Sequence, residues 1–385
     1  MAKQASPKLD ELEIPALPGQ KEEVQLEEAA EDVFDYDVAF NFGFVGIGQA
    51  GSRIAQAFYD LGYRRVCVID GPIQDLAAIS PEIAKLNLGT GGAGKDIDYG
   101  AASLTDKEEL IWDLFTRTFG KGLDYILVCA SLGGGTGSGG CPRLIQIAKR
   151  YMAGIGKPEK VGCVVALPML AEGQRFARNA VTTFGRLRRL PDKPSPMIII
   201  DNQRIQELFP VGVSKIYQKC NEQTARLFHL FNQLAAQRCG LVAFDRAELA
   251  ALLDKGIVVF GASAIEKFGS AADVSEAIRS QLERTALAAV DLKTGKEAGC
   301  IFVGGKETLD SVPMDFLDGG FNMLTRLLGE GATVHRGVYE GSAAGLRCFT
   351  LLAGLDPPAE RLKALSSTAQ FTGSTLAKHL GVDGA

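Results

Sequence analysis

Short apolar segments alternate with amphipathic stretches along residues 40–212. The apolar segments have the length and composition of strands that are buried on both faces. Because strand and helix patterns alternate, the sequence predicts a parallel sheet covered by helices. The predicted strands are Phe40–Val45, Val66–Ile69, Tyr125–Ala130, Val161–Leu167 and Met197–Ile200, and the predicted helices include Arg53–Leu61 and Pro142–Met152.

A long amphipathic stretch, Val213–Gln237, follows this region and predicts a single helix. Beyond it, strands are predicted at Ile257–Gly261, Cys300–Val303, Val334–Tyr339 and Leu346–Leu352, with helices at Val274–Val290 and Gly319–Leu328. The fold class is therefore α/β, with a parallel-sheet domain joined by a long central helix to a smaller α+β domain. We expect an N-terminal extension (1–39), the sheet domain (40–212), the central helix (213–239), the second domain with its entry loop (240–365) and a tail (366–385).

Charge is distributed unevenly along the chain. The formal net charge is −5, yet residues 1–40 alone hold eleven Asp and Glu against three Lys. This acidic arm is typical of a solvated extension and is a candidate site for an adaptor protein. The remaining chain has no dense Lys/Arg tract, so we expect no dedicated nucleic-acid binding.

No apolar run reaches the roughly 20 residues that a membrane-spanning helix needs, and the N-terminus lacks a signal-peptide pattern. The eight cysteines are scattered singly, mostly in apolar segments, as in proteins of a reducing compartment. We therefore expect a cytoplasmic protein without membrane insertion. The three histidines lie far apart in the sequence and predict no transition-metal site.

The first chemical signal is the segment Gly46-Ile47-Gly48-Gln49-Ala50-Gly51, between a predicted strand and a predicted helix. Asp70 ends the next predicted strand. In a dinucleotide-binding fold, this arrangement supplies the phosphate loop and the acid that binds the ribose. Taken alone, the segment favours an NAD-type oxidoreductase.

A second loop, Gly133–Gly139 (GGGTGSG), lies between the strand Tyr125–Ala130 and a helix. Its glycines permit a tight turn with N–H groups directed inward, and the helix N-terminus adds the positive end of its dipole. Thr136 and Ser138 add hydroxyls for a phosphate or for a magnesium-bound water. A third loop occupies Gly89–Gly94. Three such loops suit a nucleoside triphosphate better than a dinucleotide, which uses one.

GGGTGSG resembles the GGGTG[ST]G signature of the tubulin/FtsZ superfamily, and the similarity continues in order through residues 40–355. The resemblance implies a GTPase that binds GTP or GDP with Mg²⁺ and assembles head to tail with itself. It implies that the phosphate-side loops contribute Gly46, Gly48, Gln49, Ala50, Gly51, Asp70, Gly91, Gly92, Ala93, Gly133, Gly134, Gly135, Thr136, Gly137 and Ser138.

The resemblance extends to the sugar and base. Glu172 and Arg175 resemble a ribose-contacting segment, although a surface salt bridge would need the same residues. Asn202 resembles the asparagine that bonds guanine, although asparagine is also a common helix cap. Asn221 and Glu222 match the polar pair that the family places against the guanine edge, where a carboxylate accepts from two donors that adenine lacks.

The resemblance also places a catalytic loop at Gly240–Leu249. FtsZ-like members carry N-x-D-x-x-D there, whereas this chain has Ala243 and Glu248 at the first and last of these positions. Asp245 and Glu248 keep the acid spacing and are the candidates to orient the attacking water on the next subunit. The same spacing is that of a helix capping box, and the two roles are compatible.

Three functions remain open at this point. The first is a filament-forming GTPase that acts in cell division, plasmid or phage DNA positioning, or cell shape. The second is the NAD-type enzyme, which leaves two glycine loops unused. The third is a non-polymerising regulatory relative, which Ala243 favours. Residues Phe371–Ala385 lack the acidic-apolar-basic peptide of division-type FtsZ, which argues against a direct assignment to cell division.

Overall fold

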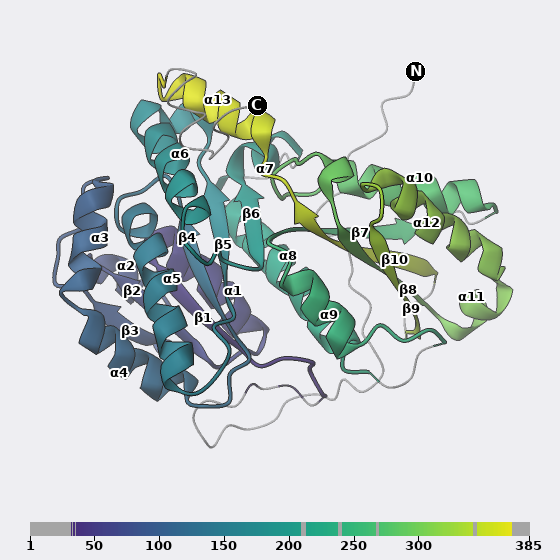
Figure 1. Ribbon diagram of the computed structural model, residues 1–385, viewed down its shortest axis with the longest axis horizontal. Coiled ribbons are helices and arrows are strands. Elements are labelled where there is room, and N and C mark those ends of the chain that lie inside the picture. The colour runs from purple at the N-terminus through teal and green to yellow at the C-terminus, as the bar shows by residue number, and fades with distance from the viewer. Residues whose placement is uncertain are drawn as a thin grey trace. The chain divides into compact units, whose positions relative to one another are not determined.

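The computed structural model describes residues 32, 34, 36–208, 213–237, 241–266, 269–341 and 345–371. The chain divides into two compact units. The N-terminal unit contains Phe40–Gln203 and the chain from Pro358 onward, and the C-terminal unit contains Arg204–Pro357 and the segment Phe34–Ala39. Figure 1 labels their helices and strands.

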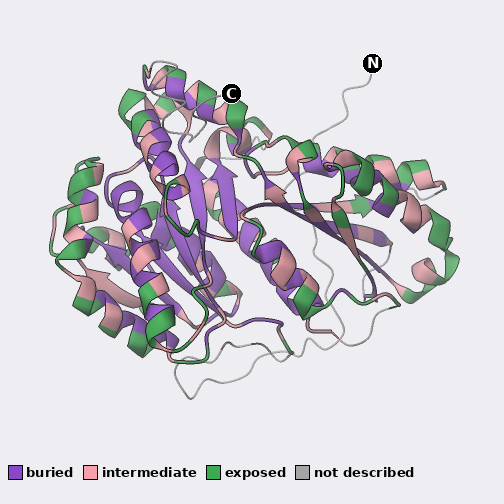
Figure 2. Cartoon of the chain, viewed as in Figure 1, coloured by how far each residue is buried: buried purple, intermediate pink, exposed green. Residues whose placement is uncertain are grey.

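The N-terminal unit is built on a parallel sheet, as the alternating pattern predicts. Its strand order is β3-β2-β1-β4-β5-β6, and every pairing between these neighbours is parallel. Strands β1, β4 and β5 are buried along almost their whole length (Figure 2). The strands are β1 (Phe42–Ile47), β2 (Val66–Asp70), β3 (Ala84–Asn87), β4 (Tyr125–Ser131), β5 (Val161–Leu167) and β6 (Met197–Asp201).

Helices follow nearly every strand of this unit. They are α1 (Gly48–Leu61), α2 (Ile73–Ala77), α3 (Ile97–Thr105), α4 (Glu108–Phe119), α5 (Thr136–Gly154), the 3-10 turn η2 (Leu170–Glu172) and α6 (Gln174–Arg188). Helix α7 (Asn202–Leu208) begins directly after β6. Two helices start earlier than the sequence predicts: α1 at Gly48 rather than Arg53, and α5 at Thr136 rather than Pro142. Glycine has a low helix propensity, so the sequence pattern hides these first turns.

The last described helix, α13 (Ala359–Thr368), belongs to the N-terminal unit and packs against α6. From the sequence, residues up to 365 are instead predicted to belong to the second domain and those from 366 onward to the tail. Leu362 and Leu365 of α13 are completely buried, which the short apolar pattern does not reveal.

The C-terminal unit is a mixed α+β structure. Its strands follow the order β7-β10-β8-β9, with β10 antiparallel to both neighbours and β8 parallel to β9. Their bounds are β7 (Ile257–Ile265), β8 (Glu297–Gly304), β9 (Thr333–Glu340) and β10 (Leu346–Leu355). The helices are α8 (Val213–Leu234), α9 (Arg246–Leu253), α10 (Ala271–Glu283), the 3-10 turn η3 (Leu292–Thr294), α11 (Lys306–Ser311) and α12 (Met314–Leu327).

Helix α10 differs most from its predicted range, Val274–Val290. Its N-cap is Ser270, whose hydroxyl accepts a hydrogen bond from the N–H of Asp273, and the helix ends at Glu283. The apolar residues Leu287 and Ala288 are buried beyond the helix end. Their burial continues the apolar pattern and explains why the sequence predicts a longer helix.

Candidate nucleotide site and catalytic loop

The three glycine loops all lie at the carboxyl edge of the parallel sheet. The first joins β1 to α1, the second joins β4 to α5, and the third follows β3. Because the strands are parallel and adjacent in the order β3-β2-β1-β4, their carboxyl ends share one edge. The topology therefore brings together segments that are far apart in the sequence.

The first and second loops contact each other through the main chain. A Cβ atom built on Gly48 would lie 3.0 Å from the nitrogen of Gly137, and Gly48 has a φ of +71°. A Cβ atom on Gly51 would lie 2.2 Å from the carbonyl oxygen of Cys129 in β4. No larger residue fits such positions without moving the backbone. These glycines set the distance between the two loops.

The second and third loops also pack closely. A Cβ atom on Gly135 would lie 2.8 Å from the Cβ of Ala93 and 2.9 Å from the nitrogen of Lys95. A Cβ atom on Gly134, in contrast, would have no protein atom within 4 Å. The main-chain groups of the three loops, Gly46–Gly51, Gly89–Gly94 and Gly133–Gly139, form a cradle. This cradle is open at Gly134 and leaves room there for a ligand.

Helix α5 begins inside the second loop with an uncapped N-terminus. Its N-cap residue is Gly135, which has no side chain to bond the first N–H groups of the helix. An uncapped helix start attracts an anion through these N–H groups and through the helix dipole. Thr136 lies at this start and is buried, whereas the hydroxyl of Ser138 donates to the carbonyl of Ser131 at 3.3 Å. The hydroxyl of Ser138 is thus held by the strand end.

Asn179 of α6 connects the second and third loops, a role that the sequence does not predict. Its Nδ2 donates to the carbonyls of Gly133 and Gly134, each at 3.0 Å, and lies 3.1 Å from the carbonyl of Lys95. The side chain is almost completely buried. An asparagine inside an amphipathic helix carries no sequence signal for such a role, because only the fold brings these carbonyls together.

Asp70 lies at the carboxyl end of β2 and is 2% exposed. Its Oδ1 accepts from the N–H of Gly71 at 2.8 Å, while Oδ2 has no hydrogen-bond partner within the described ranges. Burial, together with the charge of Asp75, raises the pKa of Asp70 to about 6. A buried, unpaired carboxylate oxygen beside an anion cradle fits a magnesium ion or a water bound to it.

The remaining residues of the first and third loops are more accessible. Gln49 and Ala50 are exposed, and Gln49 Nε2 donates to Asp75 at 2.8 Å. Gly91 is exposed, and Gly92 and Ala93 are half-buried. The accessible loop faces are available to a ligand.

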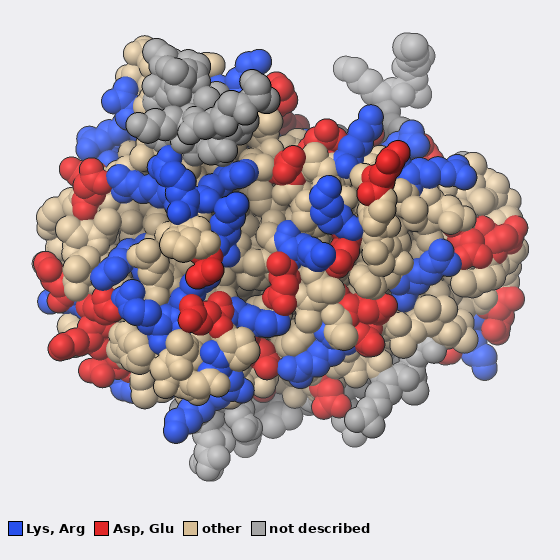
Figure 3. Space-filling model, viewed as in Figure 1, with Lys and Arg blue, Asp and Glu red and all other residues tan. Residues whose placement is uncertain are grey.

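Glu172 and Arg175 have different environments. The Oε1 of Glu172 accepts from the N–H of Met169 at 2.7 Å and closes its own turn. Arg175 is exposed and, with Lys95 and Arg178, lines a hollow of about 380 Å³. Figure 3 shows Lys and Arg side chains gathered over α6. The arrangement supplies positive charge close to the third loop, as a polyphosphate requires.

The predicted base-reading residues divide between the two units. Asn202 is the first residue of α7, directly after Asp201, whose buried carboxylate accepts from Arg361 Nε at 2.9 Å. Asn221 and Glu222 lie on α8 of the C-terminal unit and are half-buried. Glu222 accepts from Gln218 Nε2 at 2.9 Å.

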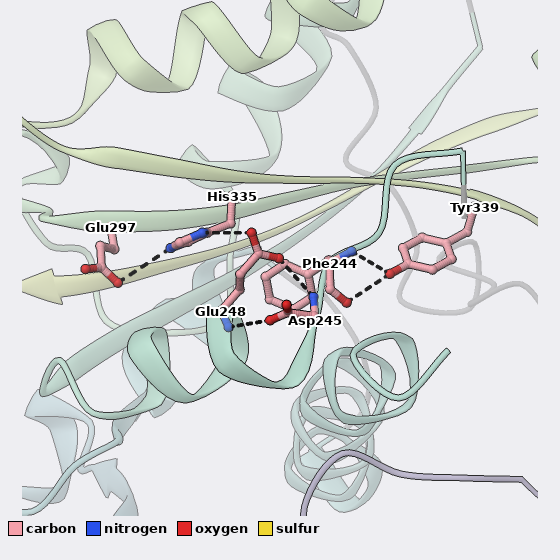
Figure 4. A network of polar contacts seen from close by, with 6 residues as sticks. All are labelled: Phe244, Asp245, Glu248, Glu297, His335 and Tyr339. Carbon is pink, nitrogen blue, oxygen red and sulfur yellow. Dashed lines mark hydrogen bonds and ion pairs between the residues drawn. The ribbon is translucent and has the colours of Figure 1, made fainter. Parts of the chain in front are cut away.

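The predicted catalytic acids form a reciprocal cap at the start of α9 (Figure 4). Asp245 Oδ1 accepts from the N–H of Glu248, and Glu248 Oε2 accepts from the N–H of Asp245, each at 2.9 Å. The second oxygen of Glu248 lies 3.1 Å from Nδ1 of His335. Both oxygens of Glu248 are therefore engaged, whereas the side chain of Asp245 is exposed.

Tyr339 of β9 anchors the residue before this cap. Its hydroxyl accepts from the N–H of Phe244 at 2.8 Å and lies within 3.2 Å of the carbonyls of Phe244 and Leu234. Burial raises the pKa of Tyr339, and the charges of Glu248 and Asp245 raise it further. The tyrosine therefore stays neutral at physiological pH and can donate a hydrogen bond. The sequence placed Tyr339 in a strand but gave it no role.

Within the described ranges, no group of three or more His, Cys, Asp or Glu side chains is arranged to hold a metal ion. Among the described helices, none combines the length and the hydropathy of a membrane span. Residue Gly240, where the predicted catalytic loop begins, lies outside the described residues, as do most of the acidic arm and the end of the tail.

Comparisons with known proteins agree with this architecture. The model of the family described as "Tubulin/FtsZ family, GTPase domain" matches residues 41–210, which include all three glycine loops. The chain is 25% identical over 272 residues to "Cell division protein FtsZ 1" of Pyrococcus woesei, covering 68% of this chain and 69% of the relative. It is 26% identical over 283 residues to "Tubulin-like protein CetZ2" of Haloferax volcanii, covering 70% and 76%.

Solved structures show the same fold. Protofilaments of TubZ from Bacillus thuringiensis serovar israelensis in the GDP form superpose with a TM-score of 0.72 at 17% identity, covering 87% of this chain and 91% of TubZ. CetZ2 from Haloferax volcanii, a GTPγS-bound protofilament, superposes with a TM-score of 0.69 at 23% identity, covering 86% and 97%. The signature loop, the parallel sheet that carries it and these relatives agree, and residues 41–210 match the GTPase domain of the tubulin/FtsZ family.

Proposed function

We propose that this protein is a cytoplasmic GTPase that assembles head to tail into filaments and hydrolyses GTP at the contact between subunits. The observation that carries the proposal is the cradle of glycine loops at one sheet edge, which opens at Gly134 beside the uncapped start of α5. Related proteins described as protofilaments support self-assembly. The dinucleotide alternative loses its support, because Gly46–Gly51 lies inside the GTPase-family match.

The residues of the cradle fit a nucleoside triphosphate. Main-chain N–H groups at the start of α5 would hold phosphate oxygens, and Arg175 would add positive charge. Asp70 and the hydroxyl of Thr136 would hold Mg²⁺ or its waters. When bound, the metal would neutralise charge on the phosphate oxygens. Asn202, Asn221 and Glu222 would read the guanine edge.

Hydrolysis requires an acid that can orient water on the nucleotide of a neighbouring subunit. Asp245 is exposed and uses one oxygen in the helix cap, so its carboxylate can reach a partner. Glu248 has both oxygens engaged and instead holds Asp245 in place. We therefore assign the water-orienting role to Asp245 and a positioning role to Glu248.

Activity that is completed between subunits predicts a specific dependence on concentration. The GTPase rate per subunit should rise steeply above a threshold protein concentration, measured by phosphate release alongside light scattering. Electron microscopy with GTP, GDP and ATP should show filaments that depend on the guanine triphosphate. A total rate that scales linearly with protein down to dilute solution would contradict catalysis between subunits.

A non-polymerising relative is the second candidate, and Ala243 favours it, because the position that resembles the asparagine of FtsZ-like members is here an exposed alanine. Such a protein would bind GTP and scatter no light at any concentration. We also propose that the acidic N-terminal arm recruits an adaptor protein. Deletion of residues 1–31 should then abolish recruitment while leaving GTP binding intact.

A further inference from the structure

His335 of β9 lies between two carboxylates in the C-terminal unit (Figure 4). Its Nδ1 is 3.1 Å from Oε1 of Glu248, and its Nε2 is 3.7 Å from Oε2 of Glu297 on β8. The side chains of His335 and Glu297 are only 16% and 15% exposed. Lys255, in the turn after α9, pairs with the other oxygen of Glu297 at 2.9 Å.

The charged groups near the ring come from every neighbouring element. Helix α9 contributes Glu248 and the adjacent Asp245, β8 contributes Glu297, and the turn after α9 contributes Lys255. The next residue of β9, Arg336, pairs with Asp318 of α12 at 3.2 Å. Because side chains alternate along a strand, that pair belongs to the opposite face of the sheet.

The proton count of the imidazole decides how many carboxylates it can bind. A neutral ring has one N–H and one acceptor nitrogen, whereas the imidazolium has two N–H donors. With its single proton on Nδ1, the neutral ring would bond Glu248 and turn a lone pair toward Glu297. Among the described residues, Nε2 of His335 and Oε2 of Glu297 are buried atoms without a hydrogen-bond partner. A second proton would place a positive charge and an N–H opposite Oε2 at 3.7 Å, the distance of an ion pair.

Glu248 connects His335 to Asp245, the proposed catalytic acid. Glu248 uses Oε1 toward His335 and Oε2 toward the N–H of Asp245. A bridge from Glu297 through His335 therefore fixes the carboxylate that closes the cap of α9. Without the contact to Glu297 the ring holds Glu248 through Nδ1 alone, so the two side chains can shift together and the orientation of Asp245 is less restricted.

We propose that His335 is a proton-sensitive positioning residue: its doubly protonated ring ties Glu248 to Glu297 and holds Asp245 in the orientation that hydrolysis requires. The inference rests on the proposed function, because it assigns a control device to the same catalytic loop. It adds that GTP turnover should increase as the ring takes up a proton.

Two substitutions separate the contacts of the ring. The amide nitrogen of His335→Asn falls near the position of Nδ1 and can donate to Glu248, but it does not titrate. The amide nitrogen of His335→Gln falls near the position of Nε2 and can reach Glu297, but it loses Glu248. GTPase rates of the full chain are measured from about pH 6 to 8, where histidines change charge, at protein concentrations above the assembly threshold.

The wild type should gain about tenfold in kcat toward the acid end of this range, the effect of one hydrogen bond to a charged group. His335→Asn bonds Glu248 without reaching Glu297, as the neutral ring does, so its rate should stay close to the alkaline-side value of the wild type at every pH. His335→Gln reaches Glu297 without bonding Glu248 and should also stay about tenfold below the acid-side value of the wild type throughout. Glu297→Gln should move the rise toward lower pH. Melting temperature and GTP affinity should change little in these variants, which separates the effect from unfolding.

The outcomes distinguish this inference from the proposed function. A wild type without GTP hydrolysis, or an Asp245→Asn variant with full activity, removes the proposed function. Normal hydrolysis that depends on Asp245, with the same pH profile in wild type and His335→Asn, overturns only the role of His335. If the His335 variants fail to fold, the Glu297→Gln profile decides, because an unshifted rise contradicts the bridge.

Discussion

The glycine loops of the N-terminal unit and the start of α9 in the C-terminal unit are organised by different parts of the chain. The glycine loops meet through main-chain atoms, and their spacing depends on the absence of side chains at Gly48, Gly51 and Gly135. The start of α9 is held by side chains, with Glu248 and Tyr339 in central positions. A site built from closely packed main chain tolerates few substitutions. In a site built from side chains, one substitution can remove a single contact and leave the others in place.

The largest expected effect is on the rate of GTP hydrolysis, from a substitution at the start of α9. Asp245→Asn should lower GTP hydrolysis about a thousandfold, the scale of a lost acid in catalysis, because an amide cannot accept a proton from water. Asparagine is a good N-cap, so α9 should remain folded and filaments should persist for longer. Phosphate release and light scattering measure both results.

A matched control for this variant is Asp315→Asn, the same change at an exposed first-turn acid of α12. It should hydrolyse GTP at the wild-type rate. If Asp245→Asn retains a rate within about threefold of the wild type, the loop plays no direct part in catalysis.

The second expected effect is on the free energy of unfolding, from a substitution in the glycine loops. Gly51→Ala should destabilise the nucleotide-free protein by about 3 kcal/mol, because its Cβ would lie 2.2 Å from the carbonyl oxygen of Cys129 in a buried strand. Urea unfolding measures the change. Gly91→Ala is the control, since its Cβ meets no atom within 4 Å and should leave the unfolding midpoint unchanged. Equal midpoints for the two variants would mean that the loops do not depend on this close approach.

A third substitution separates folding from binding within the cradle. Gly134→Ala adds a methyl group where no protein atom lies within 4 Å, so the unfolding midpoint should not change. If phosphate fills that space, GTP affinity should fall about tenfold, or about 1.4 kcal/mol, in titration calorimetry. The neighbouring Gly135→Val, whose side chain collides with Ala93, should abolish binding. Unchanged affinity in Gly134→Ala would place the phosphates elsewhere.

The smallest effect should be the pH dependence due to Asp70. Its pKa is raised from 3.8 to about 6 in the folded state, so the folded protein binds this proton more tightly than the unfolded chain does. The contribution of Asp70 to stability is therefore lost as pH rises from about 4 through 6. Relative to the wild type, nucleotide-free Asp70→Asn should gain a few degrees in melting temperature across that window and remain level above it. A constant difference at all pH values would contradict the raised pKa.

The features that the sequence predicts are those formed by residues close together in the chain. GGGTGSG between a buried strand and a helix identified the second loop, and the structure explains its glycines by close packing, since a Cβ atom on Gly139 would lie 2.0 Å from the carbonyl oxygen of Ile97. The spacing of Asp245 and Glu248 is compatible with both a capping box and a catalytic role, and the structure contains the capping box. Asn179 was missed because its three carbonyl partners come from loops that are distant in the sequence.

By itself, the sequence determined the fold class, the resemblance to the tubulin/FtsZ superfamily and the glycine loops, since periodic burial and runs of glycine are local properties of the chain. Only the tertiary structure decided which groups surround those loops and the start of α9. His335 lies 87 residues after Glu248, and no local pattern records their contact. The pairing of β8 with β9 and the packing of α9 on β8 bring these residues together, because buried polar atoms must find partners in the folded chain.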